Sequence, residues 1–78
     1  MPKLVPVSST KMMKILKRLG FSLIRVKGSH YFWHCGQTGK NTIVPKHSRK
    51  TLDTSLIRLI LNQIDLTVED YDKLRREC

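Results

Sequence analysis

The chain has 78 residues, which is enough for one small hydrophobic core. Apolar residues make up 40% of it, which is enough to fold and does not indicate intrinsic disorder. No apolar run approaches the ~20 residues of a membrane-spanning helix, and no secretory signal precedes the first predicted helix. We therefore expect a single domain over residues 1–78 in a soluble, cytoplasmic protein.

The net charge of +9 is unevenly distributed along the chain. Residues 1–52 contain eleven Lys and Arg and no Asp or Glu, whereas residues 53–78 carry a local charge of −2. A field of one sign attracts polyanions and favours a nucleic acid as the partner. Two other interpretations of the basic residues remain, namely a solvated face and a docking surface for an acidic protein. An acidic membrane surface is disfavoured because no amphipathic helix rich in Trp or Phe accompanies the basic residues.

After a proline-punctuated segment over residues 1–7, which we expect to be extended or loosely ordered, the first helix is predicted. It begins at Ser8 or Ser9, either of which can serve as the N-cap, and it runs to about Leu19. Gly20 then supplies the left-handed residue that ends a helix. One face is apolar at helical spacing, through Met12, Ile15, Leu16 and Leu19. The opposite face carries Lys11, Lys14 and Arg18, as solvated charges or as phosphate contacts.

Three strands are predicted next, over residues 21–26, 30–35 and 42–44. Lys27-Gly28-Ser29 forms the turn between the first two, and Pro45 ends the third because proline cannot donate to the ladder. On the second strand, alternation places two sets of side chains on opposite faces, namely His30, Phe32 and His34 against Tyr31, Trp33 and Cys35. In the first strand the apolar alternation changes phase after Leu23, so its faces cannot be assigned.

A basic connector leads to a helix over residues 54–63, capped by Asp53. Its apolar side chains surround most of the helix, so we expect it to be buried against both the sheet and another helix: Leu56, Ile57, Leu59, Ile60, Leu61 and Ile64. Thr67 caps a last helix whose inward face is Val68, Tyr71 and Leu74. The predicted fold class is α+β, in the order α-β-β-β-α. It has a three-stranded antiparallel sheet, helices on one face and an extra short C-terminal helix.

Metal binding is poorly supported by the sequence. A zinc site is suggested by the grouping of His30, His34 and Cys35, with His47. On a strand, however, His30 and His34 lie roughly 13 Å apart, which is too far for both to bind one ion at ~2.1 Å. Magnesium chemistry needs clustered carboxylates, and all six acids follow residue 52. We expect no metal and no other cofactor, and we expect Cys35 and Cys78 to be reduced thiols.

Cleavage of RNA without a metal requires fewer specialised side chains from the protein than metal-dependent cleavage does. The substrate contributes its 2′-hydroxyl as the nucleophile, and the protein supplies a proton acceptor or donor near neutral pH together with cations for the charge on the phosphate. Histidine is the side chain whose ordinary pKa lies near neutrality. His30 follows a Gly-Ser turn and has Lys27, Arg25 and Lys46 nearby in the sequence. These residues alone do not exclude a purely structural role, in which His30 begins a strand and forms a hydrogen bond to a neighbour.

A set of short motifs resembles the HicA toxin family. The resemblance runs from the first helix to about Leu66, through Gly20-Phe21, Arg25, Gly28-Ser29-His30, Val44-Pro45-x-His47 and the apolar helix that starts at Leu56. It implies a fold like that of double-stranded-RNA-binding domains and an mRNA-cleaving toxin whose active site is covered by a partner antitoxin, HicB. It assigns the catalytic histidine to His30 and the positioning turn to Gly28 and Ser29. Pro45 and His47 match an element without an assigned role.

Two departures from the family pattern flank the second helix. Thr54-Ser55-Leu56 stands where family members usually have Gly-Thr-Leu, and Ile64-Asp65 stands where they commonly have Ala-Gly. Asp tolerates a left-handed cap less well than Gly, so we expect a reshaped exit from this helix.

The predicted function is therefore a metal-independent mRNA endoribonuclease, the toxin of a type II toxin–antitoxin system, with His30 as general acid or base. The RNA phosphates would be held by Lys27, Arg25, Lys40, Lys46, Lys11 and Lys14. Tyr31 or Trp33 could stack on a base, although core packing is the stronger expectation for Trp33. The alternatives are a non-catalytic RNA-binding module of the same fold, or a domain that has lost activity and only binds its partner.

Overall fold

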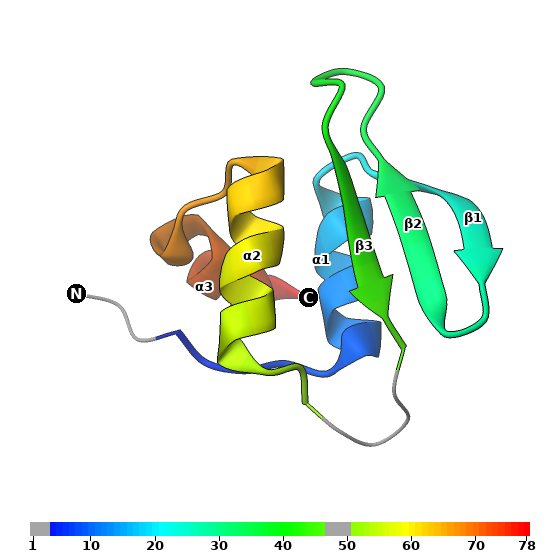
Figure 1. Cartoon of the computed structure of the whole chain (residues 1–78). Helices are drawn as coiled ribbons and strands as arrows, with labels where there is room; N and C mark the ends of the chain where they lie inside the picture. The colour runs from blue at the N-terminus through cyan, green and yellow to red at the C-terminus, as the bar shows by residue number, and fades with distance from the viewer. Residues whose placement is uncertain (1–3, 47–50) are drawn as a thin grey trace.

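Three antiparallel strands in the order β1-β2-β3 form one sheet, and the helices lie on one side of it (Figure 1). The computed structural model describes residues 4–46 and 51–78. In chain order the elements are α1 (Ser9–Arg18), β1 (Ser22–Lys27), β2 (His30–His34), β3 (Asn41–Pro45), α2 (Thr54–Ile64) and α3 (Val68–Glu77). This order confirms the predicted α+β fold with an added C-terminal helix, similar to that of double-stranded-RNA-binding domains.

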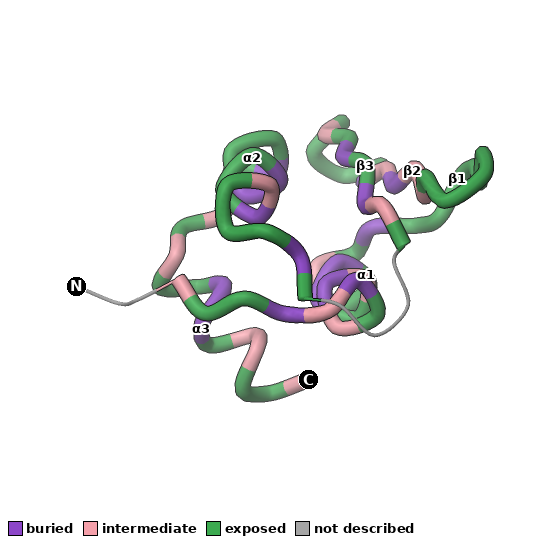
Figure 2. Tube along the Cα trace, turned by 60° about the horizontal axis from the view of Figure 1, so that its bottom comes forward, coloured by how far each residue is buried: buried purple, intermediate pink, exposed green. Residues whose placement is uncertain are grey.

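The core lies between the sheet and the helices, and every layer contributes a fully buried side chain to it. Trp33 comes from β2, Val44 from β3, Ile15 from α1, Ile60 from α2 and Tyr71 from α3. By contrast, β1 is exposed along its whole length, at the end of the sheet farthest from α2 (Figure 2). The helices therefore cover β2 and β3 and leave β1 projecting beyond them.

A β-bulge in β1 explains the change of phase in its sequence. Leu23 pairs with Trp33 and Val26 pairs with Tyr31, but the register shifts just after Leu23. Directly paired residues project to the same face of a sheet, and a bulge inserts one residue into that alternation. Leu23 and Val26 consequently both lie on the helix side, and Ile24 is the inserted residue.

The faces of β2 are those that alternation predicts. Trp33 and Cys35 are buried on the helix side of the sheet, whereas His30, Phe32 and His34 lie on the opposite face, hereafter the open face. Cys35 and Cys78 are not joined by a disulfide.

Helix α1 forms as its sequence predicts. The hydroxyl of Ser8 accepts a hydrogen bond from the backbone N–H of Lys11 at 3.2 Å, and Gly20 follows the helix with φ of +94°. The stripe of Met12, Ile15 and Leu16 is fully buried.

Helix α2 departs from prediction in two details. Asp53 is the N-cap residue, but its carboxylate accepts from the Ser55 hydroxyl and makes no bond to the helix backbone. Leu59 is 52% exposed, so the apolar surface of α2 is less completely buried than the prediction of burial against both the sheet and another helix implies. The buried face is Ile57, Ile60, Leu61 and Ile64. A helix in the outer layer of a one-sided sheet keeps a face in solvent.

The exit from α2 is also different from the prediction. Asp65 adopts the left-handed conformation with φ 57° and ψ 42°, and its N–H and that of Leu66 return to the carbonyls of Asn62 and Leu61. The helix therefore ends as it would with glycine, and the expected reshaping of this exit was wrong.

The segment before α1 is held to the rest of the molecule. Val7 is buried, and its carbonyl accepts a hydrogen bond of 2.8 Å from the N–H of Leu52. The hydroxyl of Tyr71 on α3 donates to the carbonyl of Val5. Residues 4–7 are thus ordered by contacts, and the alternative of a loose segment was wrong for them.

Helix α3 is built as predicted. The Thr67 hydroxyl accepts from the N–H of Asp70, Tyr71 is buried, and Val68 and Leu74 pack against the core. Of the helices in the described ranges, none has the length and apolar character needed to cross a membrane.

Candidate functional site

A tight turn places His30 at the start of β2. Lys27 and His30 pair across it, and Gly28 has a φ of +60°. Ser29 is not among the residues with a positive φ, and a two-residue hairpin turn with a positive φ at its first central position alone is of type II′, which favours glycine there. A Cβ on Gly28 would meet nothing within 4 Å, so the backbone conformation, and not lack of space, calls for glycine.

The turn is fastened to the end of β3. His30 pairs with Pro45, which has no N–H, and the N–H of Lys46 instead donates to the carbonyl of Ser29 at 2.7 Å. This bond continues the ladder past the proline and holds Lys46 beside the turn. Gly28 and Ser29, the predicted positioning residues, thus form the turn directly before His30.

His30 is exposed on the open face, among cations. Lys27 lies directly opposite it on β1, and the guanidinium of Arg25 lies 5.7 Å from the centroid of the Phe32 ring on the same face. His34 shares this face at the far end of β2, where its Nδ1 lies 2.5 Å from Oδ1 of Asn41. Within the described ranges, no three His, Cys, Asp or Glu side chains cluster closely enough to hold a metal ion.

The remaining predicted phosphate contacts are scattered. Lys46 adjoins the turn, but its ammonium lies on the helix side of the sheet, 5.5 Å from the centroid of Tyr31. Lys14 lies on α1, and Lys11 donates to the carbonyl of Cys78. Lys40 lies at the far end of the sheet from His30, 4.0 Å from the Asp65 carboxylate. The structure therefore brings Arg25 and Lys27 to the face of His30. Lys46 adjoins the turn but directs its ammonium to the other side of the sheet, and Lys40 and Lys11 lie away from His30. His47 lies outside the described residues.

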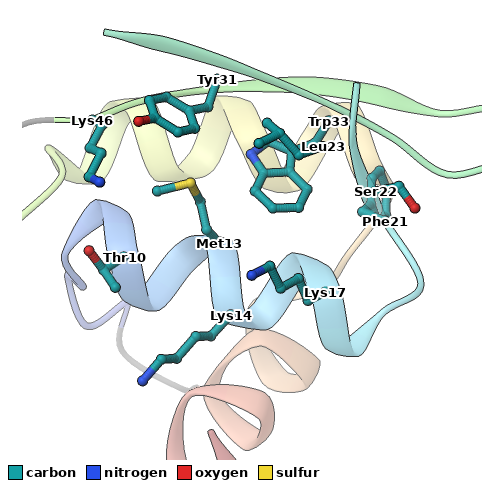
Figure 3. A pocket seen from close by; sticks show the side chains of 10 residues that line it. All are labelled: Thr10, Met13, Lys14, Lys17, Phe21, Ser22, Leu23, Tyr31, Trp33 and Lys46. Carbon is teal, nitrogen blue, oxygen red and sulfur yellow. The ribbon is translucent and has the colours of Figure 1, made fainter. Parts of the chain in front are cut away.

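A groove between α1 and the helix side of the sheet was not predicted. Its volume is about 560 Å³, and its apolar lining comes from Met13, Phe21, Leu23, Tyr31 and Trp33 (Figure 3). Lys17 and Lys46 stand on its two sides. Neither Met13 nor Lys17 was singled out from the sequence as a functional residue. The available signal was the spacing of Lys14 and Lys17, which puts both on the edge of α1 next to its apolar stripe.

Fold and site together define a small basic α+β protein that presents an exposed histidine at a glycine-containing turn. The family model described as the HicA toxin of bacterial toxin–antitoxin systems matches residues 9–66, most of the chain. The chain therefore belongs to the HicA toxin family, which confirms the resemblance found in the sequence motifs. Membership makes it the toxin of a toxin–antitoxin pair, with a cognate antitoxin as its partner. No curated protein matches the chain.

Proposed function

We propose that this toxin is a metal-independent endoribonuclease that cleaves mRNA with His30 as general acid or base. The observation that carries the proposal is the exposed imidazole at the start of β2, opposite Lys27 and beside Arg25 on one open face. The six acids all follow residue 52, so the face that carries His30 has no carboxylates for a magnesium site.

Each group on this face matches one requirement of the reaction. The 2′-oxygen forms a bond to the adjacent phosphorus as its proton leaves to an acceptor, and the bond from phosphorus to the 5′-oxygen breaks as that oxygen gains a proton. Neutral His30 can accept the first proton, and its imidazolium form can donate the second. The ammonium of Lys27 and the guanidinium of Arg25 stabilise the charge that develops on the phosphate oxygens.

The test compares His30→Ala with the wild type on a labelled single-stranded RNA in the presence of EDTA. We expect the loss of the proton-transfer group to slow cleavage by about 10²- to 10⁴-fold and to abolish toxicity on expression. His34→Ala is the matched control, since it removes an imidazole from the same face of the same strand. It should cleave normally. Equal thermal unfolding midpoints would show that both variants keep the fold.

The outcomes separate the candidate functions. Undiminished cleavage by His30→Ala removes the catalytic assignment. RNA binding by the wild type without any fragments favours the non-catalytic RNA-binding module, whose shape recognition suits this fold.

We further propose that a HicB-like antitoxin covers the face around His30. Its support is the exposed, cationic character of that face, which an acidic protein surface would complement and bind rapidly. Cleavage that continues unchanged when the antitoxin is added at moderate salt would contradict this occlusion.

A further inference from the structure

We propose that the groove between α1 and the sheet is a subsite that receives an unpaired base of the RNA. The inference rests on the proposed action on RNA and adds a second recognition surface on the other side of the sheet from His30. Three features of the groove point to a nucleotide: its apolar walls, its cations and an unused hydrogen-bond donor.

The walls of the groove suit a flat, partly apolar ring. Met13 rises from α1 toward the sheet, and Tyr31 and Trp33 face it from β2 (Figure 3). A volume of about 560 Å³ exceeds what a single base requires. Tyr31 is only partly buried, and an aromatic ring of this kind holds a base by stacking, which is tolerant of sequence because every base has a π-face.

The charges around the groove suit the phosphates of the same nucleotide. The ammonium of Lys17 lies under Trp33, and that of Lys46 lies next to Tyr31 on the opposite side of the groove (Figure 3). None of the described lining residues is acidic. An apolar peptide would leave both ammonium groups without a counter-charge, whereas a nucleotide supplies one.

The third feature is the indole N–H of Trp33. Trp33 is 2% exposed, and among residues 4–46 and 51–78 its Nε1 is the one buried side-chain polar atom without a hydrogen-bond partner. A buried donor left unsatisfied costs about 1–3 kcal/mol. Figure 3 shows this nitrogen on the side of the ring that faces Met13 and Tyr31. The thioether chain of Met13 is flexible, so a base can displace it and accept the hydrogen bond from its edge.

The groove is connected to the catalytic turn through one residue. The side chain of Lys46 lines the groove, and its backbone N–H binds the carbonyl of Ser29, next to His30. An RNA strand with one base in the groove can therefore follow Lys46 around the end of the sheet to the open face.

Trp33 is the only tryptophan in the chain, so its fluorescence reports on the groove directly. The experiment titrates the His30→Ala protein, in which we expect cleavage of the ligand to be strongly slowed, with a short single-stranded RNA and with an abasic oligomer of the same ribose-phosphate backbone. We expect saturable quenching by the RNA and none by the abasic oligomer. Quenching by both would place the phosphates, not a base, at Trp33, and would overturn the proposal.

Variants then test each contact by the anisotropy of labelled RNA. Lys17→Glu should weaken binding by about tenfold, while the matched control Lys73→Glu on α3 should leave it unchanged. Trp33→Phe keeps a ring but removes the donor, and should weaken binding by about three- to tenfold.

Failure of the subsite and failure of the proposed function give different results. RNA binding and cleavage that are intact in Lys17→Glu, without quenching in the His30→Ala titration, would overturn the subsite alone. Quenching that appears only with an acidic peptide would also overturn it. Quenching by RNA from a wild-type protein that never cleaves would leave the subsite standing and remove the nuclease.

Discussion

Gly28 and Asp65 both have a positive φ, and they illustrate two ways in which one residue sets the local path of the backbone. Gly28 shapes the turn that carries His30, with φ of +60°. Asp65 ends α2 with φ of 57° in a conformation that costs an ordinary L-residue about 1–2 kcal/mol. The sequence predicts the first because Gly-Ser between two strands is a turn signal. It did not predict the second, because the bonds from Asp65 and Leu66 to α2 carbonyls keep the left-handed exit despite the side chain.

The strain at Asp65 predicts that Asp65→Gly stabilises the protein. We expect the free energy of unfolding to rise by about 0.5–1 kcal/mol, measured by urea denaturation, because glycine adopts this conformation without a Cβ clash. The lost contact to Lys40 matters little, since the Asp65 side chain is 84% exposed and the two charged atoms are 4.0 Å apart. The control, Asp65→Ala, removes the same carboxylate but keeps a Cβ, and it should destabilise. Equal effects of both substitutions would show that the charge, and not the backbone, matters here.

At the scale of elements, β1 and α2 mark the limit of what local patterns predict. Each predicted strand and each of the first two helices agrees with the structure to within one residue at either end, because turn residues and helix caps act locally. The bulge after Leu23 is decided by pairing with β2, which lies later in the chain. The exposure of Leu59 is decided by which faces of α2 other elements reach. The segment of β1 shows only the change of phase after Leu23, and neither the bulge nor the exposure of Leu59 is fixed by the segment itself.

Helix α3 is joined to the segment before α1 through Tyr71, and this predicts a pH dependence of stability. Burial raises the pKa of Tyr71 to about 12 from the ordinary value of 10.0. The unfolded chain therefore releases this proton first, so the stabilising contribution is complete below pH 10 and is lost as the pH rises from 10 to about 12.

Tyr71→Phe separates this contribution from the other groups that titrate in alkali. At neutral pH the variant should be about 1 kcal/mol less stable, because the bond to the Val5 carbonyl is lost. Above pH 10 that deficit should shrink, since only the wild type has this group to ionise. The measurement is urea unfolding of both proteins at a series of pH values. A deficit that stays constant into alkali would contradict the assignment.

For the whole molecule, the distribution of charge between its parts says more about where a polyanion can bind than the net charge does. The six acids all lie in the last third of the chain, where Asp72 binds Arg75 and Arg76, and Glu77 lies 3.5 Å from Arg18. The sheet and its groove are left strongly basic. Sequence reasoning identified this asymmetry and the central histidine because both are visible residue by residue. It missed the groove because the two walls, α1 and β2, meet only in the folded chain.

This asymmetry predicts a measurable change in salt dependence. In the His30→Ala background, Lys27→Glu should weaken RNA binding and reduce the slope of log Kobs against log salt concentration by about 0.7, the value for one phosphate contact of a single strand. Lys73→Glu, which lies among the acids of α3, should leave the slope as it was. Identical slopes for the two variants would remove Lys27 from the RNA-binding face.

The exposed strand β1 has a consequence for the protein in concentrated solution. It is an edge strand, and Leu23, Ile24 and Val26 on it are between 43% and 60% exposed. An apolar edge of this kind can pair with the same strand of another molecule and start aggregation. Arg25 and Lys27 interrupt the apolar run with repelling charges. The cations beside His30 thus also disfavour the edge-to-edge pairing of separate copies of the toxin, a colloidal role that does not depend on the proposed chemistry.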